Sequence, residues 1–227
     1  MKKLILLLFA ITFLVNCKQS NKLNTTINGT VVGLQKGTIY LQEYTQNGKQ
    51  TIDSITVNGT DTFVFNFNLK EPQLLAITLN KNKEQTILLF AEQGTVDFKT
   101  QLHKFAFKAS FKGFENQKLL EEHDNYTQKI KFQNLDLIKE KMDAVKSGAS
   151  KDSLKLIEDK YNRNLKRMYL FTTNYAIQHK NTPIAPYLAL TKMERANPIL
   201  KEKIYNALSI HIKESKYGLL LKKSLNL

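Results

Sequence analysis

The chain has few of the residue types that carry redox or metal chemistry. Among its 227 residues there is one cysteine, Cys17, and no tryptophan. A single cysteine excludes an intramolecular disulfide, a CxxC redox pair and a thiolate metal cluster. The fold must therefore be held together by the packing of hydrophobic residues, which make up 42% of the chain.

Catalytic signatures are also scarce. No GxSxG, P-loop or GxGxxG motif is present, which removes the common patterns of serine hydrolases and nucleotide-binding proteins. Glu121-Glu122-His123-Asp124 is the densest polar cluster, and its expected roles are helix capping and solvation rather than general base catalysis. The histidines have no metal-binding spacing and are dispersed at His103, His123, His179 and His211. We therefore predict no catalytic, cofactor-binding or metal-binding residues, and a protein that is not an enzyme.

Only one long apolar run occurs, and it lies at the N-terminus. Met1-Lys2-Lys3 is positively charged, and Leu4–Val15 is apolar. An apolar run of about 12 residues is too short for a membrane-spanning helix, which needs about 20, but it is typical of a secretion signal. Residues 1–16 are therefore predicted to be a signal peptide.

Leu14-Val15-Asn16-Cys17 resembles the lipobox of bacterial lipoproteins. In that class the cysteine becomes the first mature residue and carries the lipid, so Cys17 is the predicted lipidation site and residues 17–25 a lipidated tether. The alternative is an incidental thiol. The resemblance implies a protein anchored to a membrane of the cell envelope, and Lys18 after the cysteine favours the outer membrane, facing the periplasm.

The chain is strongly basic, with a net charge of +14. The surplus attracts anions such as lipid headgroups, envelope glycans or nucleic acid. Its lysines are scattered and are not interleaved with stacking aromatic residues, which favours a solvated surface and argues against a nucleic acid partner.

Residues 26–112 have the pattern of short strands separated by turns. Alternation of apolar and polar residues predicts strands at Thr38–Tyr44, Thr62–Phe67, Gln73–Leu79, Thr86–Ala91, Thr95–Thr100 and Phe105–Phe111. Asn47-Gly48 and Asn58-Gly59 tolerate positive φ and predict hairpin reversals. This spacing predicts an antiparallel β-sandwich or small barrel.

Residues 113–227 change to helical periodicity, so the predicted fold class is α+β. The first apolar stripe comprises Leu119, His123, Tyr126, Ile130, Leu135, Ile138, Met142 and Val145. The second comprises Leu154, Ile157, Tyr161, Leu165, Met168, Thr172 and Tyr175. We expect the two long helices to form an antiparallel hairpin, with Ser150 or Asp152 capping the second helix.

Shorter helices should close this helical module after a break at Asn181-Thr182-Pro183. The expected pieces are Pro186–Met193, Pro198–Ile212 and Ser215–Leu225. Packing in the core is expected to account for nearly all the aromatic residues and methionines of the module.

A family resemblance runs through both halves. In the first half it is carried by Ile52–Gly59, Phe63-Val64-Phe65 and Pro72, which resemble the N-terminal β module, DUF4369, of TlpA/ResA-like lipid-anchored thiol-disulfide oxidoreductases. The later helical pieces of that family are similar to Gly113–Asn116, Thr182–Tyr187 and Ser215–Gly218.

In that family a thioredoxin-like domain with a Trp-Cys-x-x-Cys site follows, and this chain contains no such motif. Thiol-disulfide exchange needs an attacking and a resolving thiol, so no catalytic residue is carried over. The resemblance implies a non-catalytic, lipid-anchored envelope protein that acts as a binding or accessory module, with a membrane and a protein as its partners. Two alternatives stay open: a component that recruits a separate thioredoxin-like domain, and a binder of anionic envelope polymers.

Overall fold

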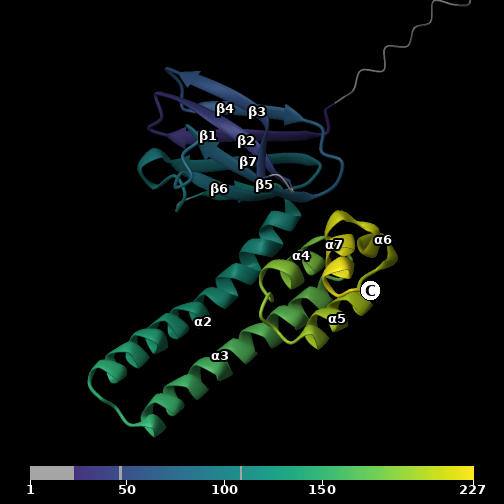
Figure 1. The fold of residues 1–227 in the computed structure, drawn as a ribbon. Coiled ribbons are helices and arrows are strands. Elements are labelled where there is room, and N and C mark those ends of the chain that lie inside the picture. The colour runs from purple at the N-terminus through teal and green to yellow at the C-terminus, as the bar shows by residue number, and fades with distance from the viewer. Residues whose placement is uncertain (1–22, 46–47, 108) are drawn as a thin grey trace, which may run out of the picture.

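The computed structural model describes residues 23–45, 48–107 and 109–227. In this part of the chain a β module is followed by a helical module (Figure 1). The predicted signal peptide and Cys17 lie outside the described residues. Thr25, which the sequence assigned to the tether, is the first residue of the first strand.

The β module consists of two four-stranded sheets. The first sheet has the order β4-β1-β7-β8, with strands β1 (Thr25–Val32), β4 (Thr62–Phe67), β7 (Gly94–Gln101) and β8 (Ser110–Lys112). The second has the order β3-β2-β5-β6, with strands β2 (Lys36–Thr45), β3 (Gly48–Asn58), β5 (Gln73–Leu79) and β6 (Thr86–Ala91).

The two sheets enclose one core, as binary patterning dictates. In β4 the side chains of Phe63, Phe65 and Phe67 are buried, whereas the residues between them are exposed. Phe63 lies over Gly29 of β1, where any Cβ would collide with its ring. The predicted sandwich is therefore confirmed, and the predicted small barrel is wrong because the strands form two separate sheets.

Three details differ from the sequence prediction. β1 pairs with β7 in parallel, so the first sheet is mixed. The Asn58-Gly59 turn reverses the chain, but β3 and β4 belong to different sheets and form no hairpin. The predicted strand Phe105–Phe111 is wrong over most of its length: the short 3₁₀ helix η1 (Leu102–Lys104) precedes it, and only β8 is extended. The buried Phe105 side chain produced the misleading alternation.

The helical module begins with two long helices and ends with four short ones. Their bounds are α2 (Glu115–Lys146), α3 (Lys151–Gln178), α4 (Ile184–Thr191), α5 (Pro198–Ala207), α6 (Ile210–Glu214) and α7 (Lys216–Ser224). The hairpin of α2 and α3 is confirmed, and the Ser150 hydroxyl caps α3 by accepting from the Ser153 backbone N–H at 3.2 Å. The single helix expected over Pro198–Ile212 is two helices.

The start of α2 is fixed to the β module. The Glu92 carboxylate, in the turn between β6 and β7, accepts from the backbone N–H groups of Glu115 and Asn116, which are unpaired donors of the first helical turn. Gly113 has a φ of +130°, and a Cβ there would collide with the Thr95 carbonyl oxygen. Only glycine therefore fits the entry to this helix.

An aromatic cluster joins the two modules. Phe90 of β6 contacts Tyr187 of α4 and Tyr217 of α7, with ring centroids 5.1 and 5.6 Å apart. The Tyr217 hydroxyl accepts from the Leu74 N–H at 2.9 Å, and burial raises the pKa of Tyr217 to about 12. The helices thus cover the outer face of β5 and β6, which explains why these strands are apolar on both faces.

Candidate functional site

The helical hairpin divides into a base, beside the β module, and a distal half that ends at residues 147–150. At the base, His123 of α2 is 1% exposed. Its Nε2 lies 3.0 Å from the Thr172 hydroxyl of α3, and its Nδ1 lies 3.3 Å from an oxygen of Asp124. Both ring nitrogens are therefore occupied by groups of the protein itself.

Asp124 connects α2 to the end of α4. Its carboxylate lies 2.8 Å from the Lys192 Nζ at the end of α4 and 3.9 Å from the Lys131 Nζ. Burial would raise the pKa of Asp124, but hydrogen bonds from His123 and Lys192 and the charges of Lys192 and Lys131 lower it to about 2. The Glu121–Asp124 cluster therefore ties α2 to α3 and α4, and the capping role expected for it is wrong, because α2 begins at Glu115.

Stacked rings surround His123. The His123 ring lies 5.7 Å from Phe171, which in turn stacks on Tyr126 at 3.7 Å. The Tyr175 hydroxyl donates to the Leu119 carbonyl at 2.8 Å, and burial together with the neighbouring Glu122 carboxylate raises the pKa of Tyr175 to about 12. A histidine enclosed in this way packs the base and cannot meet a substrate without rearrangement.

The other three histidines lie on separate elements. His103 belongs to η1, His179 ends α3 and His211 belongs to α6. Within residues 23–45, 48–107 and 109–227, no three His, Cys, Asp or Glu side chains gather in a way that could hold a metal ion. In the same residues no helix is both long and apolar enough to span a membrane.

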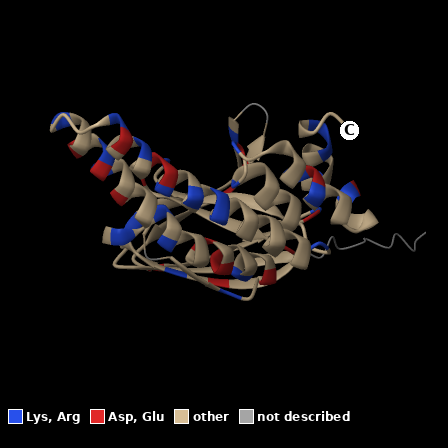
Figure 2. Ribbon diagram, turned by 90° about the horizontal axis from the view of Figure 1, so that it is seen from below, with Lys and Arg blue, Asp and Glu red and all other residues tan. Residues whose placement is uncertain are grey.

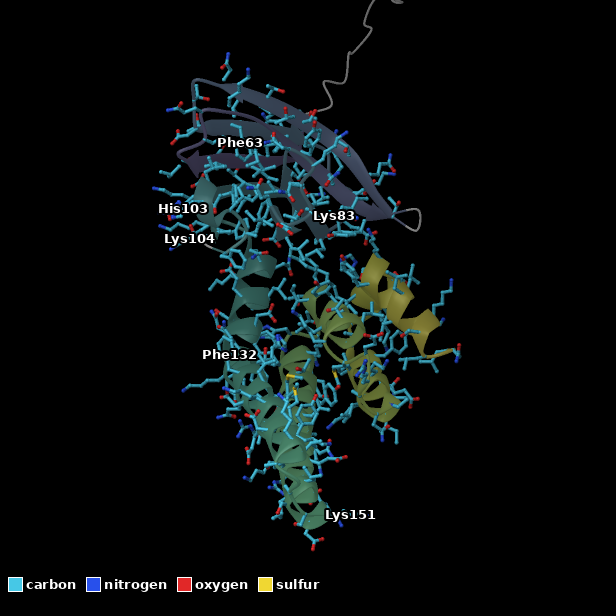
Figure 3. The ribbon with its side chains drawn as sticks, turned by 60° about the vertical axis from the view of Figure 1, so that its left-hand side comes forward. Phe63, Lys83, His103, Lys104, Phe132 and Lys151 are labelled. Atoms are coloured by element: carbon cyan, nitrogen blue, oxygen red, sulfur yellow. The ribbon has the colours of Figure 1, made fainter. Side chains whose placement is uncertain are left out.

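The described residues leave most of the distal half of the hairpin uncovered. α2 and α3 are 32 and 28 residues long, which corresponds to about 48 and 42 Å, whereas α4 has 8 residues and spans about 12 Å. The short helices contact the hairpin near its base, and the long helices project beyond them (Figure 1). In Figure 3, Lys151 marks the tip of this projection, far from Phe63 in the β module.

Four large apolar side chains of α2 are exposed on this distal half. Leu135, Ile138, Met142 and Val145 are 59%, 44%, 57% and 58% exposed. Their spacing of three, four and three residues places them on one side of the helix, which we call the apolar flank. The expectation that these residues pack in the core is wrong, because nothing in the described part of the chain covers them.

A groove runs beside the apolar flank, between α2 and α3. The groove has a volume of about 280 Å³, and Ile138, Ile157 and Tyr161 contribute its apolar lining. Lys141 and Glu158 span it with an ion pair of 3.0 Å. The distal hairpin therefore presents an elongated apolar surface with one charged pair across it.

The opposite side of the hairpin is polar, and we call it the charged flank. Asp136 of α2 shares a recess of about 490 Å³ with Lys160, Arg163 and Arg167 of α3. Glu140 lies 3.9 Å from Lys160 on this side. Acids and bases therefore face each other here, and both signs of charge are visible along the long helices in Figure 2.

The exposure of the distal half was not predicted from the sequence, although the sequence contains a signal for it. The predicted long helices are several times longer than the predicted short ones, and a helix of about 12 Å cannot cover one of about 48 Å. Periodicity identifies one face of a helix, but it does not say what covers that face.

The architecture defines a two-sheet β-sandwich that carries a helical hairpin. Residues 25–120 match the model of the family described as Domain of unknown function (DUF4369). The chain therefore contains a DUF4369 domain, which comprises the β module and the first residues of α2, and this part of the predicted resemblance is confirmed. Neither a curated protein nor a solved structure matches the chain.

Proposed function

We propose that this protein is a non-catalytic, lipid-anchored component of the cell envelope that holds a partner protein on the distal half of its helical hairpin. Its anchor is the lipid on Cys17, and its site is the outer membrane, with the folded body in the periplasm. The observation that carries the proposal is the apolar flank.

Exposed apolar surface at this scale calls for a physical reason. A large apolar side chain that stays in water lacks the roughly 1.5–3 kcal/mol of stabilisation that its burial would contribute. Single exposed hydrophobic residues are common, but a row of four beside an apolar groove is typical of an interaction surface. The hairpin supplies this surface without exposing the core of either module.

The position of the hairpin suits an anchored protein. The first described residue, Leu23, precedes β1 and lies at the β module, whereas the hairpin tip lies at the far end of α2 (Figures 1 and 3). A lipid attached a few residues before Leu23 would therefore hold the β module near the membrane. The apolar flank would be available to a partner at a distance from that membrane.

A photo-crosslinking amino acid placed at Met142 tests the partner. Introduced in the living cell, it should give adducts of discrete mass. Leu156 is the matched control, because it is also apolar and is 63% exposed, but lies on α3 four residues before Lys160, on the charged flank. Adducts at both positions, or at neither, would contradict the proposal.

The anchor and the lack of catalysis are tested separately. Metabolic labelling with an alkyne fatty acid should mark the protein, and Cys17→Ser should abolish both the label and retention in the membrane fraction. Turnover in an insulin-reduction assay by the purified chain alone would overturn the non-catalytic assignment.

A further inference from the structure

We infer that the apolar flank binds an amphipathic helix with acidic borders, supplied by a partner protein and lying where α4 would continue along the hairpin. The inference rests on the proposed function and specifies the chemistry of the partner. Three features of the described residues carry it: the position of α4, the repeat along α2 and the surplus of lysines beside the apolar flank.

The groove between α2 and α3 already holds a third helix at the base. α4 contacts both long helices there, and Tyr187 and Leu188 of α4 share a buried cluster with Leu119 and Leu120 of α2. Beyond Thr191 the chain continues into α5, whose first residues lie beside Asn162 and Lys166 of α3. The base is therefore a three-helix arrangement, and the distal half has the same groove without its third helix.

The side of α2 that contacts the end of α4 continues into the apolar flank. Lys192, directly after α4, contacts Asp124. Lys131, Ile138 and Val145 follow Asp124 at successive intervals of seven residues, and a heptad interval keeps residues on one side of a helix. A helix lying along the continuation of α4 would therefore run over Ile138 and Val145.

Lysines outnumber acidic residues beside the apolar flank on the distal half of α2. Lys139 and Lys146 each follow a residue of the apolar flank by four positions and therefore border it. Asp136 and Glu140 lie on the charged flank, opposite the cations of α3, whereas Asp143, four residues after Lys139, is the one acidic residue of distal α2 beside the lysines. An occupant with carboxylates beside its own apolar stripe complements this border.

The same border disfavours two other occupants. A second copy of the chain, packed antiparallel on the flank about a two-fold axis, would bring the border that carries Lys139 and Lys146 against the same lysine border of the other copy. A bilayer is attracted by lysines, but a flat surface fills the groove beside Ile138 and Tyr161 poorly, whereas a helix fits it. A helix in this groove buries apolar surface on α2 and α3 together.

Two synthetic peptides test the inference on the full chain carrying Cys17→Ser. Each has about three heptads with leucine at the core positions, and the bordering positions are glutamate in one peptide and lysine in the other. We expect the glutamate peptide to bind about tenfold more tightly than the lysine peptide, with affinity falling as salt rises. Fluorescence anisotropy of labelled peptides measures both affinities.

Variants locate the contact and its charge. Met142→Asp should weaken binding of the glutamate peptide by about tenfold or more, whereas the control Leu156→Asp, on the charged flank, should leave it unchanged. Lys139→Glu combined with Lys146→Glu should reverse the preference between the peptides. All these positions are exposed, so circular dichroism should show unchanged folding. Equal binding of the peptides, or binding that Met142→Asp does not affect, would overturn the inference.

Two further measurements separate the alternatives. If sedimentation shows a dimer that Met142→Asp dissociates, the flank binds a second copy of the chain. If the protein floats with phosphatidylglycerol vesicles and Met142→Asp abolishes this, the flank binds a membrane. Either result overturns the acidic helix. Adducts at Met142 in cells together with no binding of the glutamate peptide would refute the helix chemistry alone. Absence of adducts at Met142 would refute the proposed function itself.

Discussion

The two halves of the helical hairpin are built from the same two helices, yet they differ in almost every physical respect. At the base, Ile130 is 3% exposed and His123 is enclosed by rings and hydrogen bonds. A few turns further along α2, Met142 is 57% exposed. At the base, the short helices of the same chain cover the hairpin, whereas the distal half has an apolar surface that the described residues leave uncovered.

This difference teaches that one periodic pattern can serve two purposes. In the base the apolar stripe of α2 stabilises the fold, and in the distal half its continuation is available for binding. If this division is correct, similar substitutions in the two halves should have different consequences for stability, since a substitution acts on stability through burial.

The largest expected contrast compares two isoleucines of α2. Ile130→Ala should lower the free energy of unfolding by about 3 kcal/mol because it leaves a cavity in the base. Ile138→Ala, at a residue that is 44% exposed, should change it by less than about 0.5 kcal/mol. Urea denaturation followed by circular dichroism measures both, and equal losses would remove the distinction between the two halves.

His123→Ala should have the next largest effect. It removes a buried ring and leaves the Thr172 hydroxyl without its imidazole partner, so we expect a loss of about 2 kcal/mol. Thermal denaturation of His123→Ala beside Phe132→Ala, whose side chain is exposed, provides the comparison. A neutral His123→Ala would show that the enclosed histidine does not stabilise the base.

A smaller effect is expected from pH. The folded-state pKa of Asp124 is about 2, below its ordinary value of 3.8, so the charged carboxylate stabilises the fold above about pH 4. That stabilisation is lost as pH falls from about 4 to about 2. Because the side chain is 40% exposed, solvent screening reduces the contribution to about 1 kcal/mol. Asp124→Asn should make the free energy of unfolding depend less on pH between about pH 4 and about pH 2. An unchanged pH dependence in this variant would argue against the ion pair with Lys192.

The smallest change should be a gain. Asn134 lies on the side of α2 that faces α3, is 8% exposed and has a side-chain carbonyl without a hydrogen-bond partner. Asn134→Leu should therefore raise the free energy of unfolding by about 0.5–1 kcal/mol, since an unpaired buried polar group is replaced by an apolar one. A lower melting temperature would mean that the amide has a partner in solution.

Much of the β module could be predicted because strand patterns are local. Thr62–Phe67, Gln73–Leu79 and Thr86–Ala91 were predicted with the bounds that the structure has. The parallel pairing of β1 with β7 could not be predicted, because it joins residues about seventy positions apart and leaves no trace in either strand. The apolar alternation around Phe105 misled the prediction, because a single buried ring in a turn resembles part of a strand.

In the helical module, the hairpin and the Ser150 cap followed from periodicity and capping chemistry. The role of His123 could not be predicted, because it depends on Thr172, almost fifty residues away. The apolar flank lay within a correctly predicted helix, and only the comparison of helix lengths could have indicated that it is exposed. Cys17 stays a prediction, since it lies outside the described residues.

The most direct test of the central claim uses the scarcity of cysteine in the chain. Met142→Cys and Leu156→Cys each introduce a thiol on an exposed position of the distal hairpin, the first on the apolar flank and the second on the charged flank, and a maleimide reagent can label it in purified protein and in intact envelopes. We predict that Met142→Cys reacts readily when purified and is protected in envelopes, whereas Leu156→Cys reacts in both. Equal reactivity of Met142→Cys in the two preparations would contradict the account, because the apolar flank would then have no partner.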